Sequence, residues 1–313
     1  MLTIPLRSYF RRVSPLTVVA VFGPTGVGKT AVAIALADRL RARGEDPVAV
    51  SADALQVYRG LETLTGAATP AERERLEHRL QGVLDVRETC TAGRYARLAH
   101  AEIDALLAEG RRPIVVGGTG LYLRAALADL DLRPPVPPAI RERIADELAT
   151  RGAPALHARL AAREPQVAGV IDPADAQRVA RALELLEAGH TPPAGAQLWT
   201  GETRHPTLLA GLVMDREALY ARIDARVRAM VDHGAVGEVE RAAAAGASAT
   251  ARKALGFQEL LDHDVEAMQR NTRRYAKRQL TWMRKLPGVR MLDVTDQPPQ
   301  ATATELHAAL NAA

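Results

Sequence analysis

The sequence contains few cysteines, aromatic residues and lysines, and each shortage limits the structures or functions that the protein can have. One cysteine among 313 residues, Cys90, leaves no partner for an internal disulfide and no thiolate cluster for a metal. This count is typical of a protein from a reducing compartment. Aromatic residues are 4% of the chain, too few for a surface on which successive single-stranded bases stack. Because lysine occurs only four times, a lysine carries more information here than an arginine.

Long apolar runs and a strong net charge are missing as well. No stretch approaches the ~20 uninterrupted apolar residues of a membrane span. Residues 1–14 include cations but lack the apolar run of a signal peptide, so we expect a flexible leader there and a cytoplasmic protein without a membrane partner. The chain is 47% hydrophobic with a formal net charge of +4, which excludes a disordered chain. A nucleic-acid partner would therefore need a local basic patch.

Apolar runs alternate with helical periodicity in most of the chain. Strands are predicted at 17–22, 47–51, 113–116 and 208–214, and helices at 31–41 and 98–108. The runs are continuous rather than alternating, which is typical of strands covered on both faces. This order predicts an α/β fold with a parallel sheet core wrapped by helices.

The pattern changes at a proline-rich segment, residues 132–140, which can be neither a helix interior nor a central strand. The periodicity from there to residue 189 is helical only. Helices are expected at 141–150, 153–163 and 175–188. We therefore expect an all-helical insertion domain at 135–205 between two core segments, 15–134 and 206–313.

Residues 23–30 match the phosphate-loop pattern G-x-x-x-x-G-K-[ST] without a gap, which makes the expected core a P-loop sheet. Glycines let consecutive backbone N–H groups point at an anion, and the following helix adds its positive N-terminal end. Lys29 supplies a point charge, and the Thr30 hydroxyl can ligate Mg²⁺, the expected cofactor. The residues expected to bind a diphosphate or nucleotide are Gly23, Pro24, Thr25, Gly26, Val27, Gly28, Lys29 and Thr30.

The loop indicates a polyphosphate ligand but not a reaction. The base-reading motif of GTPases, N-K-x-D, is absent from the sequence. The run at 113–116 ends in Gly117-Gly118-Thr119 rather than in the acid that usually holds Mg²⁺ in NTPases and kinases. Asp53 instead follows the second predicted strand, at the edge where α/β sheets bind ligands. Its carboxylate can ligate Mg²⁺, act as a general base or merely cap a turn.

Six segments of the chain form a set, of which the phosphate loop is the first. They are GPTGVGKT at 23–30, SADALQVYRG at 51–60, PIVVGGTGLYLRAAL at 113–127, DAQRVARALELLEAGHTP at 175–192, DREALYARIDARV at 215–227 with RKALGFQEL at 252–260, and RRYAKRQLTWMRK at 273–285. As a set they resemble the tRNA dimethylallyltransferases, also called tRNA isopentenyltransferases. The chain departs from that family's usual residues at Cys90, Tyr95, Ala174 and Phe257, and segment 60–68 is only loosely similar.

The resemblance implies transfer of a dimethylallyl group from dimethylallyl diphosphate to the exocyclic amine of an adenine. In that family the adenine lies immediately 3′ of the anticodon, in tRNAs that read codons starting with U. Fixed donors aimed at the charge that grows on the departing diphosphate are then the largest catalytic contribution. The resemblance assigns catalytic roles to Asp53, as the base for the amine, and to Thr119 and Arg226. Arg222 lies one helical turn before Arg226, and its role stays open.

Eight cations and no acid lie between Met268 and Arg290. This favours a phosphate-binding helix face over an ordinary solvated one, with Tyr275, Trp282 and Leu286 as an apolar stripe on the other side. The resemblance places the anticodon arm of tRNA between this core and the insertion, as between two jaws. The residues expected to contact tRNA are Asp53, Ala54, Leu55, Gln56, Thr119, Arg141, Gln177, Arg178, Val179, Ala180, Arg181, Arg252, Lys253, Phe257, Arg274, Lys277 and Arg278.

Three other functions stay open at this point. A small-molecule or nucleotide kinase shares the loop, but the missing acid after 113–116 and the basic C-terminal helix count against it. An adenylate isopentenyltransferase would act on free AMP or ATP and would leave the insertion without a role. A non-catalytic, nucleotide-gated RNA-binding module would not need Asp53. The expected partners are the tRNA anticodon arm and dimethylallyl diphosphate, and a monomer is expected.

Overall fold

Six parallel strands form one sheet in the order β3-β2-β4-β1-β5-β6. They are β1 (Val18–Phe22), β2 (Pro47–Ala52), β3 (His78–Arg79), β4 (Arg112–Gly117), β5 (Thr207–Val213) and β6 (Arg290–Asp293). The computed structural model describes residues 16–193 and 200–312, so the leader expected at 1–14 lies outside the described residues. The predicted α/β fold with a parallel sheet is confirmed.

The central strands are apolar because they are covered on every side. β1 pairs with β4 on one side and with β5 on the other, and all five of its residues are buried. All six residues of β2 are buried as well. Burying a side chain of this kind contributes roughly 1.5–3 kcal/mol relative to leaving it in water. The carboxyl ends of β1, β2 and β4 consequently form a rigid edge on which loops can be positioned.

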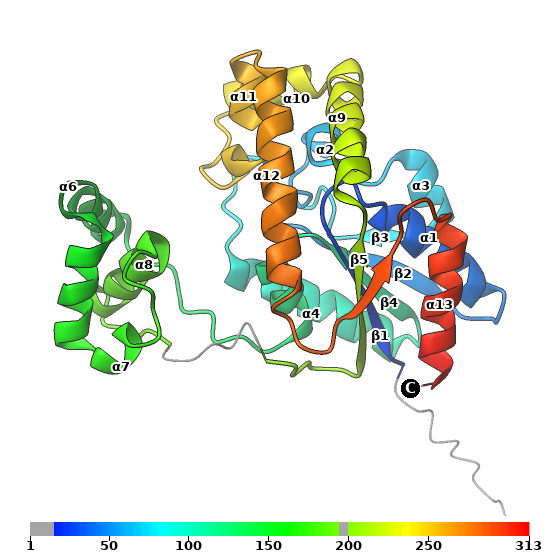
Figure 1. Cartoon of the computed structure of the whole chain (residues 1–313), viewed down its shortest axis with the longest axis horizontal. Helices are drawn as coiled ribbons and strands as arrows, with labels where there is room; N and C mark the ends of the chain where they lie inside the picture. Colours follow the sequence, from blue (N-terminus) through cyan, green and yellow to red (C-terminus); the bar gives the residue numbers. More distant parts are fainter. Residues whose placement is uncertain (1–15, 194–199, 313) are drawn as a thin grey trace, which may run out of the picture.

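Helices cover both faces of the sheet and extend beyond its carboxyl edge (Figure 1). Those of the core are α1 (Lys29–Arg41), α2 (Glu62–Thr65), α3 (Pro70–Arg75), α4 (Ala92–Ala108), α5 (Gly120–Leu127), α9 (Arg216–Asp232), α10 (Ala235–Ala244), α11 (Phe257–Leu261), α12 (Val265–Met283) and α13 (Pro299–Ala312), with a 3-10 turn at Ala251–Lys253. α13 packs on α1, and α4 packs on α5. α9 and α12 pack against each other and stand above the carboxyl ends of the strands (Figure 1). None of the described helices is both long and apolar enough to cross a membrane.

Three further helices pack around a second apolar cluster, separate from the core of the sheet. They are α6 (Pro138–Arg163), α7 (Pro165–Ala168) and α8 (Ala176–Glu187), and Figure 1 shows them set apart from the sheet. α6 is broken at Gly152, where φ is 77°, so it consists of the two shorter helices that the sequence predicts. Between α5 and β5 the described residues form no strand. The insertion boundaries at 135 and 205 remain a prediction.

The sequence patterns missed the shortest elements and one helix start. β3 has two residues and β6 has four, of which three are exposed, so neither gives a periodic apolar signal. α4 begins six residues earlier than predicted, at Ala92. There the hydroxyl of Thr91 accepts a hydrogen bond from the backbone N–H of Arg94. This N-terminal cap was the sequence signal that should have marked the start.

Candidate active site

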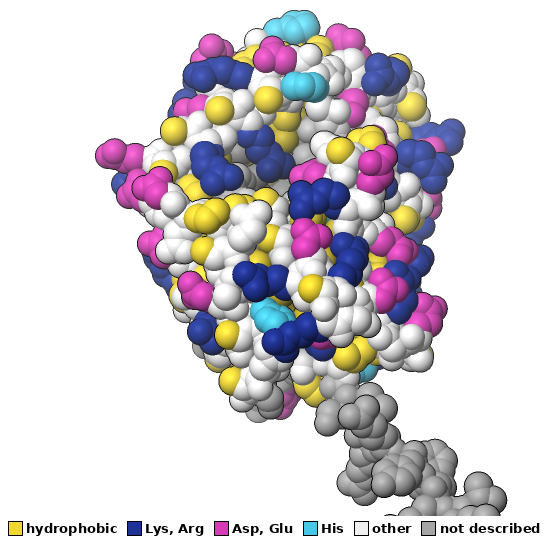
Figure 2. Space-filling view, turned by 90° about the vertical axis from the view of Figure 1, so that its right-hand side faces the viewer, with side chains coloured by type: hydrophobic (Ala, Val, Ile, Leu, Met, Phe, Trp, Pro, Cys, Tyr) yellow, Lys and Arg dark blue, Asp and Glu magenta, His cyan; other side chains and the backbone are white. Residues whose placement is uncertain are grey.

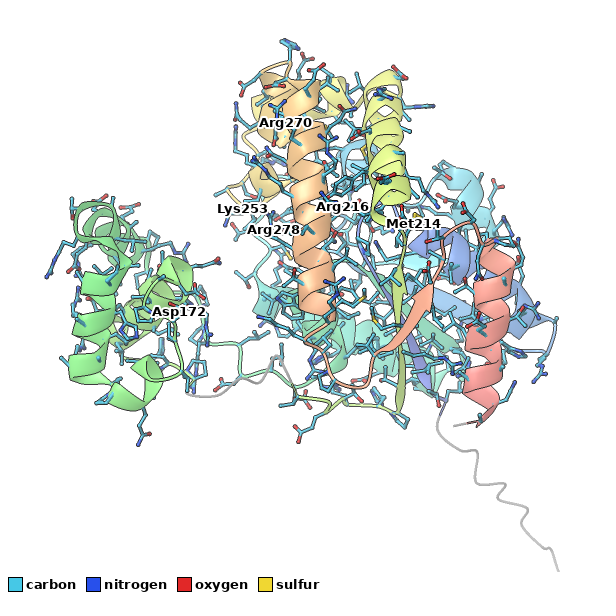
Figure 3. The ribbon with its side chains drawn as sticks, in the orientation of Figure 1. Asp172, Met214, Arg216, Lys253, Arg270 and Arg278 are labelled. Atoms are coloured by element: carbon cyan, nitrogen blue, oxygen red, sulfur yellow. The ribbon has the colours of Figure 1, made fainter. Side chains whose placement is uncertain are left out.

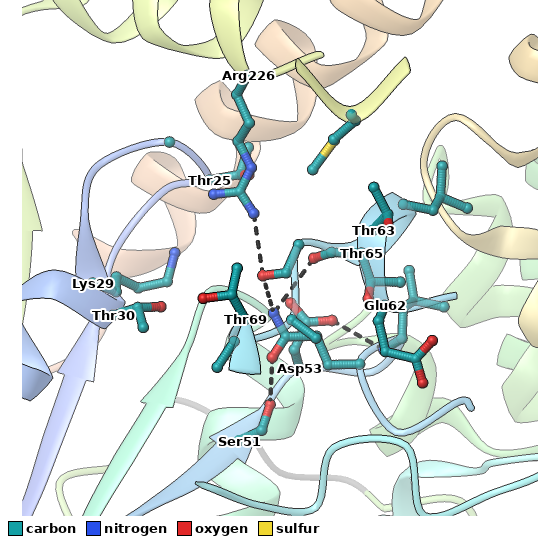
Figure 4. A pocket seen from close by; sticks show the side chains of 18 of the residues that line it. Thr25, Lys29, Thr30, Ser51, Asp53, Glu62, Thr63, Thr65, Thr69 and Arg226 are labelled. Carbon is teal, nitrogen blue, oxygen red and sulfur yellow. Dashed lines mark hydrogen bonds between the residues drawn. The ribbon is translucent and has the colours of Figure 1, made fainter. Parts of the chain in front are cut away.

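A cavity of about 970 Å³ lies at the carboxyl ends of β1, β2 and β4 (Figure 4). Its lining includes residues of the phosphate loop, of the segment after β2, of α2 and the residues that follow it, of α9 and of α12, as well as residues of the strands beneath. Of the predicted phosphate-loop residues, the lining includes Thr25, Gly26, Gly28, Lys29 and Thr30. Gly23, Pro24 and Val27 shape the loop from behind, and the side chain of Val27 is buried in the core.

The loop holds its shape through glycine conformations and through its own lysine. Gly26 and Gly28 have φ values of 83° and 99°, a region that favours glycine. The Nζ of Lys29 donates hydrogen bonds to the backbone oxygens of Gly23 at 3.0 Å and of Pro24 at 2.9 Å. The ammonium group therefore spans the loop at the place where an anion would bind.

Lys29 and Arg226 bring two positive charges to one buried place. Burial, followed by the charge of Arg226, lowers the pKa of Lys29 to about 7, while the charge of Asp53 opposes both. Burial likewise lowers the pKa of Arg226, whose Nη2 donates to the backbone oxygen of Gly66 at 3.3 Å. Figure 4 shows the two side chains reaching into the cavity from different sides. Two cations held close together out of water are a site for an anion.

Asp53 lies in the same cavity, directly after β2. Its Oδ1 accepts a hydrogen bond from the backbone N–H of Leu55 at 2.9 Å. Asp53 thus caps a turn, the structural role that the sequence left open. The capping bond also fixes its carboxylate within the electrostatic reach of Lys29 and Arg226. A base next to an anion site is the combination that a group transfer to an amine requires.

The hydroxyl of Thr30 and the carboxylate of Asp53 fit a magnesium ion that arrives with a phosphate ligand. Among the described residues no group of three or more His, Cys, Asp and Glu side chains could hold a metal by itself. Thr30 and Asp53 nevertheless both line the cavity and offer hydroxyl and carboxylate oxygens. Mg²⁺ typically takes one or two protein oxygens and completes its shell with water and substrate phosphates.

Thr119 lies beside the cavity rather than in its lining. Its Oγ1 and the Oη of Tyr275 are 2.9 Å apart, and Tyr275 does line the cavity. Burial, followed by the charge of Asp53, raises the pKa of Tyr275 to about 12. The expectation that Tyr275 belongs to an apolar stripe was therefore wrong, because its hydroxyl faces the site. A catalytic role for Thr119 stays a prediction.

The segment after β2 meets the site in different ways. Leu55 and Gln56 line the cavity, whereas Ala54 does not. The amide of Gln56 is engaged within the protein: its Oε1 accepts from the Ser51 hydroxyl at 2.8 Å, and its Nε2 donates to the backbone oxygen of Gly66 at 3.2 Å. Gln56 thereby holds the end of α2 over the cavity, in addition to the tRNA contact predicted for it.

Three cations form an exposed patch on α12, here called the basic face of α12: Arg274, Lys277 and Arg278. No ion pair within the described residues involves any of them. The expectation of a helix without compensating acids needs correction, because α9 supplies one acid and the N-terminal cap of α12 supplies another. Arg273 pairs with Asp224 of α9, and Arg270 lies 3.8 Å from Asp264, the N-terminal cap of α12.

Lys253 and Arg278 lie on the side of the core that faces α6–α8, as Figure 3 shows. The guanidinium of Arg252 lies 5.5 Å from the centre of the Phe257 ring. Phe257 was expected to contact tRNA, but its side chain is fully buried and supports Arg252 instead.

The insertion presents some of its predicted tRNA contacts and buries others. Arg141, Gln177 and Arg178 are exposed, and Ala180 is half-buried. Val179 was expected to contact tRNA, but its side chain belongs to the apolar cluster of these helices. Arg181 binds Glu184 at 3.2 Å and the backbone oxygen of Pro134 at 3.0 Å.

Two buried polar residues, one in the cavity wall and one behind α2, had no predicted role. Gln279 lines the cavity from α12 and is only 5% exposed. Glu238 of α10 accepts hydrogen bonds from the backbone N–H groups of Thr63 and Leu64, both at 2.9 Å, and so fixes the start of α2. The sequence signal that could have identified them is a polar side chain at a buried position of a helix, because such a side chain requires a hydrogen-bond partner.

Cys90 and Tyr95 are two positions at which the chain departs from the usual residues of the family that it resembles. Both are buried in the core of the sheet and do not line the cavity.

Comparisons with known proteins point to one group. The family model described as IPP transferase matches residues 56–286. The tRNA dimethylallyltransferase of Kineococcus radiotolerans is 43% identical over 290 residues, which cover 89% of this chain and 91% of the relative. That of Thermobifida fusca is 41% identical over 287 residues, or 88% and 89% of the two chains.

Two solved structures are similar over most of the chain. One is a full-length tRNA isopentenylpyrophosphate transferase from Bacillus halodurans, with 32% identity, a TM-score of 0.69, and coverage of 95% of this chain and 96% of the other. The other is a eukaryotic dimethylallyltransferase described as acting on tRNA, with 25% identity, a TM-score of 0.74, and coverage of 94% and 77%.

Proposed function

The chain belongs to the IPP transferase family, and from this premise we propose the donor, the acceptor atom and the role of each residue in its reaction. It is an enzyme that prenylates tRNA. The proposed donor is dimethylallyl diphosphate. The proposed acceptor is the exocyclic amine of the adenine immediately 3′ of the anticodon, in tRNAs that read codons starting with U. The observation that carries this proposal is the meeting of Lys29, Arg226 and Asp53 in one cavity.

The cationic side of the cavity stabilises the leaving group. The allylic C–O bond of the donor breaks, and its electron pair stays on the diphosphate, where negative charge grows. Lys29, Arg226 and the N–H groups of the glycine-rich loop are fixed around the place where that charge develops. Donors of this kind need no rearrangement when the charge appears, which makes their contribution large. Arg222 lines the same cavity but is exposed, so we give it a supporting role.

Asp53 serves the nucleophile. The exocyclic amine of adenine is a weak base, because its lone pair is delocalised into the ring. As the C–N bond forms, Asp53 accepts the proton that the amine loses, a contribution typically of about 100- to 10,000-fold. The N–H of Leu55 holds one carboxylate oxygen, so the orientation of the base is set before the substrate binds.

Thr30 is the residue that would hold Mg²⁺ through its hydroxyl, and the carboxylate of Asp53 lines the same cavity. When bound, the ion supplies additional positive charge for the departing diphosphate. The chain's own contribution is the loop that places Thr30 at the first turn of α1, where the helix N-terminus also favours an anion.

The basic face of α12 and the exposed residues of the insertion are the proposed tRNA contacts. Phosphates of an RNA backbone bind exposed cations that are not held in ion pairs, and the basic face of α12 meets this condition within the described residues. Figure 2 shows the face of the core away from the insertion, where basic and acidic side chains are intermixed, so it offers no surface of one sign. The target adenine must leave its stack to reach Asp53. We propose that the protein acts as a monomer in the cytoplasm.

One experiment tests the reaction and its base together. Purified protein is incubated with Mg²⁺, dimethylallyl diphosphate and an unmodified tRNA that has three adenines from the last anticodon position onward, and the nucleosides are analysed by mass. We expect a five-carbon gain on one adenosine, its loss in Asp53→Ala, and its retention in the surface control Asp296→Asn. Turnover of ATP on a small metabolite without any gain on tRNA would instead favour a kinase. If neither the wild type nor the variants transfer a prenyl group, and Asp53→Ala binds RNA as well as the wild type does, the non-catalytic module would be favoured.

A further inference from the structure

Gln279 joins two loops that are far apart in the sequence. Its Oε1 accepts a hydrogen bond from the backbone N–H of Thr25 at 2.9 Å, and its Nε2 donates to the backbone oxygen of Gly118 at 2.8 Å. Both polar atoms of one buried amide are therefore used, one on the phosphate loop after β1 and the other on the turn after β4. No side chain at this position other than an amide of this length can donate and accept in the same way.

The turn after β4 is shaped for the close approach of α12. A Cβ atom on Gly118 would lie 2.3 Å from the Nε2 of Gln279, and a Cβ atom on Gly120 would lie 1.9 Å from the ring of Trp282. Between them, Thr119 meets the hydroxyl of Tyr275. Three successive residues of the turn thus contact α12, and only glycine leaves room for two of these contacts.

The contact determines where the phosphate loop sits. On one side Lys29 ties the loop to itself through Gly23 and Pro24. On the other side Gln279 is the side chain that ties it to a different element, through Thr25. Removal of this amide would leave a partly buried N–H and a buried carbonyl oxygen without their partner, and the loop would no longer be linked to the turn.

We propose that Gln279 is a positioning residue of this transferase, which holds the diphosphate-binding loop against the turn after β4 so that the donor lies at a fixed place relative to Asp53. The proposal rests on the proposed function in one respect, namely that the ligand of the loop is a diphosphate. The helix that carries Gln279 on its inner face carries the basic face of α12 on its outer face. The same rigid element therefore faces RNA and holds the donor loop.

The first test replaces Gln279 with methionine, which has similar length but makes no such hydrogen bonds. The matched control is Gln300→Met on the exposed surface of α13. Calorimetry gives the Kd for inorganic diphosphate with Mg²⁺, kinetics give KM for dimethylallyl diphosphate and kcat, and filter binding gives the Kd for tRNA. We expect Gln279→Met to weaken diphosphate binding and raise KM by about tenfold, the effect of one to two net hydrogen bonds. The Kd for tRNA should change less than twofold, and the control should behave like the wild type.

A second variant keeps part of the contact. Gln279→Glu can still accept from Thr25 but cannot donate to Gly118 in its charged form, and it places a negative charge beside the diphosphate. We expect a larger loss of diphosphate affinity than in Gln279→Met, with the fold verified by circular dichroism. A merely structural residue would lower Tm in both variants and leave the Kd for diphosphate unchanged, and that result would overturn the proposal.

A double-mutant cycle tests the contact even if one variant folds poorly. Gly118→Ala forces the new methyl group against Gln279, and should weaken diphosphate binding in the wild-type background. In a Gln279→Ala background the clash with Gln279 is absent and the 3.1 Å approach of the methyl group to the backbone oxygen of Gly23 remains. The second substitution should therefore have a smaller effect there, and the two effects should not add. Full additivity would show that Gln279 does not act through the turn.

The experiments can refute the proposed function and the role of Gln279 independently of each other. If the wild type binds diphosphate but does not prenylate tRNA, the proposed function fails, while the diphosphate Kd of the variants still decides the role of Gln279. If the wild type prenylates tRNA and Gln279→Met matches it in KM, kcat and diphosphate Kd, the positioning role alone is refuted.

Discussion

Raising the pH from 7 to 9 should weaken diphosphate binding through one group, Lys29. Burial, reinforced by the charge of Arg226, holds its pKa at about 7, compared with 10.5 for an exposed lysine. A bound diphosphate favours the charged ammonium and raises that pKa again. Above pH 7 the free protein must therefore take up a proton when it binds, and affinity falls by up to tenfold per pH unit.

The magnitude follows from the protonated fraction of Lys29. At pH 7 about half of the free protein carries the charged lysine, and at pH 9 about one molecule in a hundred does, so the affinity should fall by about 50-fold.

The stability of the free protein should also depend on pH through Lys29. In the unfolded chain the pKa of this lysine has its ordinary value of 10.5, whereas the folded chain loses the proton near pH 7. Because the unfolded state binds more protons than the folded state between those two values, the free energy of unfolding of the free protein should rise with pH there.

Calorimetric titration of inorganic diphosphate with Mg²⁺ at pH 6, 7, 8 and 9 measures both the affinity and the number of protons taken up. Repeating it in buffers of different ionisation enthalpy isolates the proton count, which we expect to approach one above pH 8. The control is Lys29→Arg, because a guanidinium stays charged throughout this range. The titration of diphosphate itself occurs with both proteins and cancels in the comparison. Equal pH slopes for wild type and Lys29→Arg would refute the reasoning.

Three further changes have expected outcomes. Asp53→Asn should lower single-turnover prenyl transfer by about 100- to 10,000-fold while the Kd for tRNA and for diphosphate stays within about twofold, and a smaller drop in rate would remove Asp53 as the base. Neutralising the basic face of α12 with three glutamines should weaken tRNA binding and flatten its dependence on salt, by about one unit of slope for each RNA phosphate that is no longer neutralised; Arg39→Gln on α1 is the control, and an equal change there would argue against a specific surface. Glu238→Ala should destabilise the fold by about 1–3 kcal/mol, measured in urea, because the N–H groups of Thr63 and Leu64 lose their acceptor.

The phosphate loop and the strand-end carboxylate were predictable from the sequence because each signal is local. Eight consecutive residues specify the loop, and the buried run before it and the helix after it supply the context. Asp53 follows an apolar run directly, and parallel strands end at one edge, so its place beside the loop follows from the fold class. The insertion helices were predictable for the same reason, because their periodicity lies within single segments.

The contacts that complete the site were not predictable, because each joins distant parts of the chain. Gln279 and Thr25 are 254 residues apart, and Arg226 and Gly66 are 160 apart. Periodicity tells which face of a helix is buried but not what lies against it. Tyr275 was for this reason assigned to an apolar stripe, although the inner face of α12 packs against the polar phosphate loop and the turn that carries Thr119.

The charges of α12 show how the fold changes a sequence pattern. A run of eight cations without an acid suggests one continuous basic surface, but the packed neighbours of the helix divide it. Arg273 turns toward Asp224 and ties α12 to α9, so it stabilises the wall of the cavity and is not available to RNA. The exposed pair at Arg270 contributes little, because a 3.8 Å ion pair in water is weak. Within α12 itself, what is left for RNA is the basic face of α12, on the side away from Gln279, so one helix links the geometry of the tRNA to that of the donor.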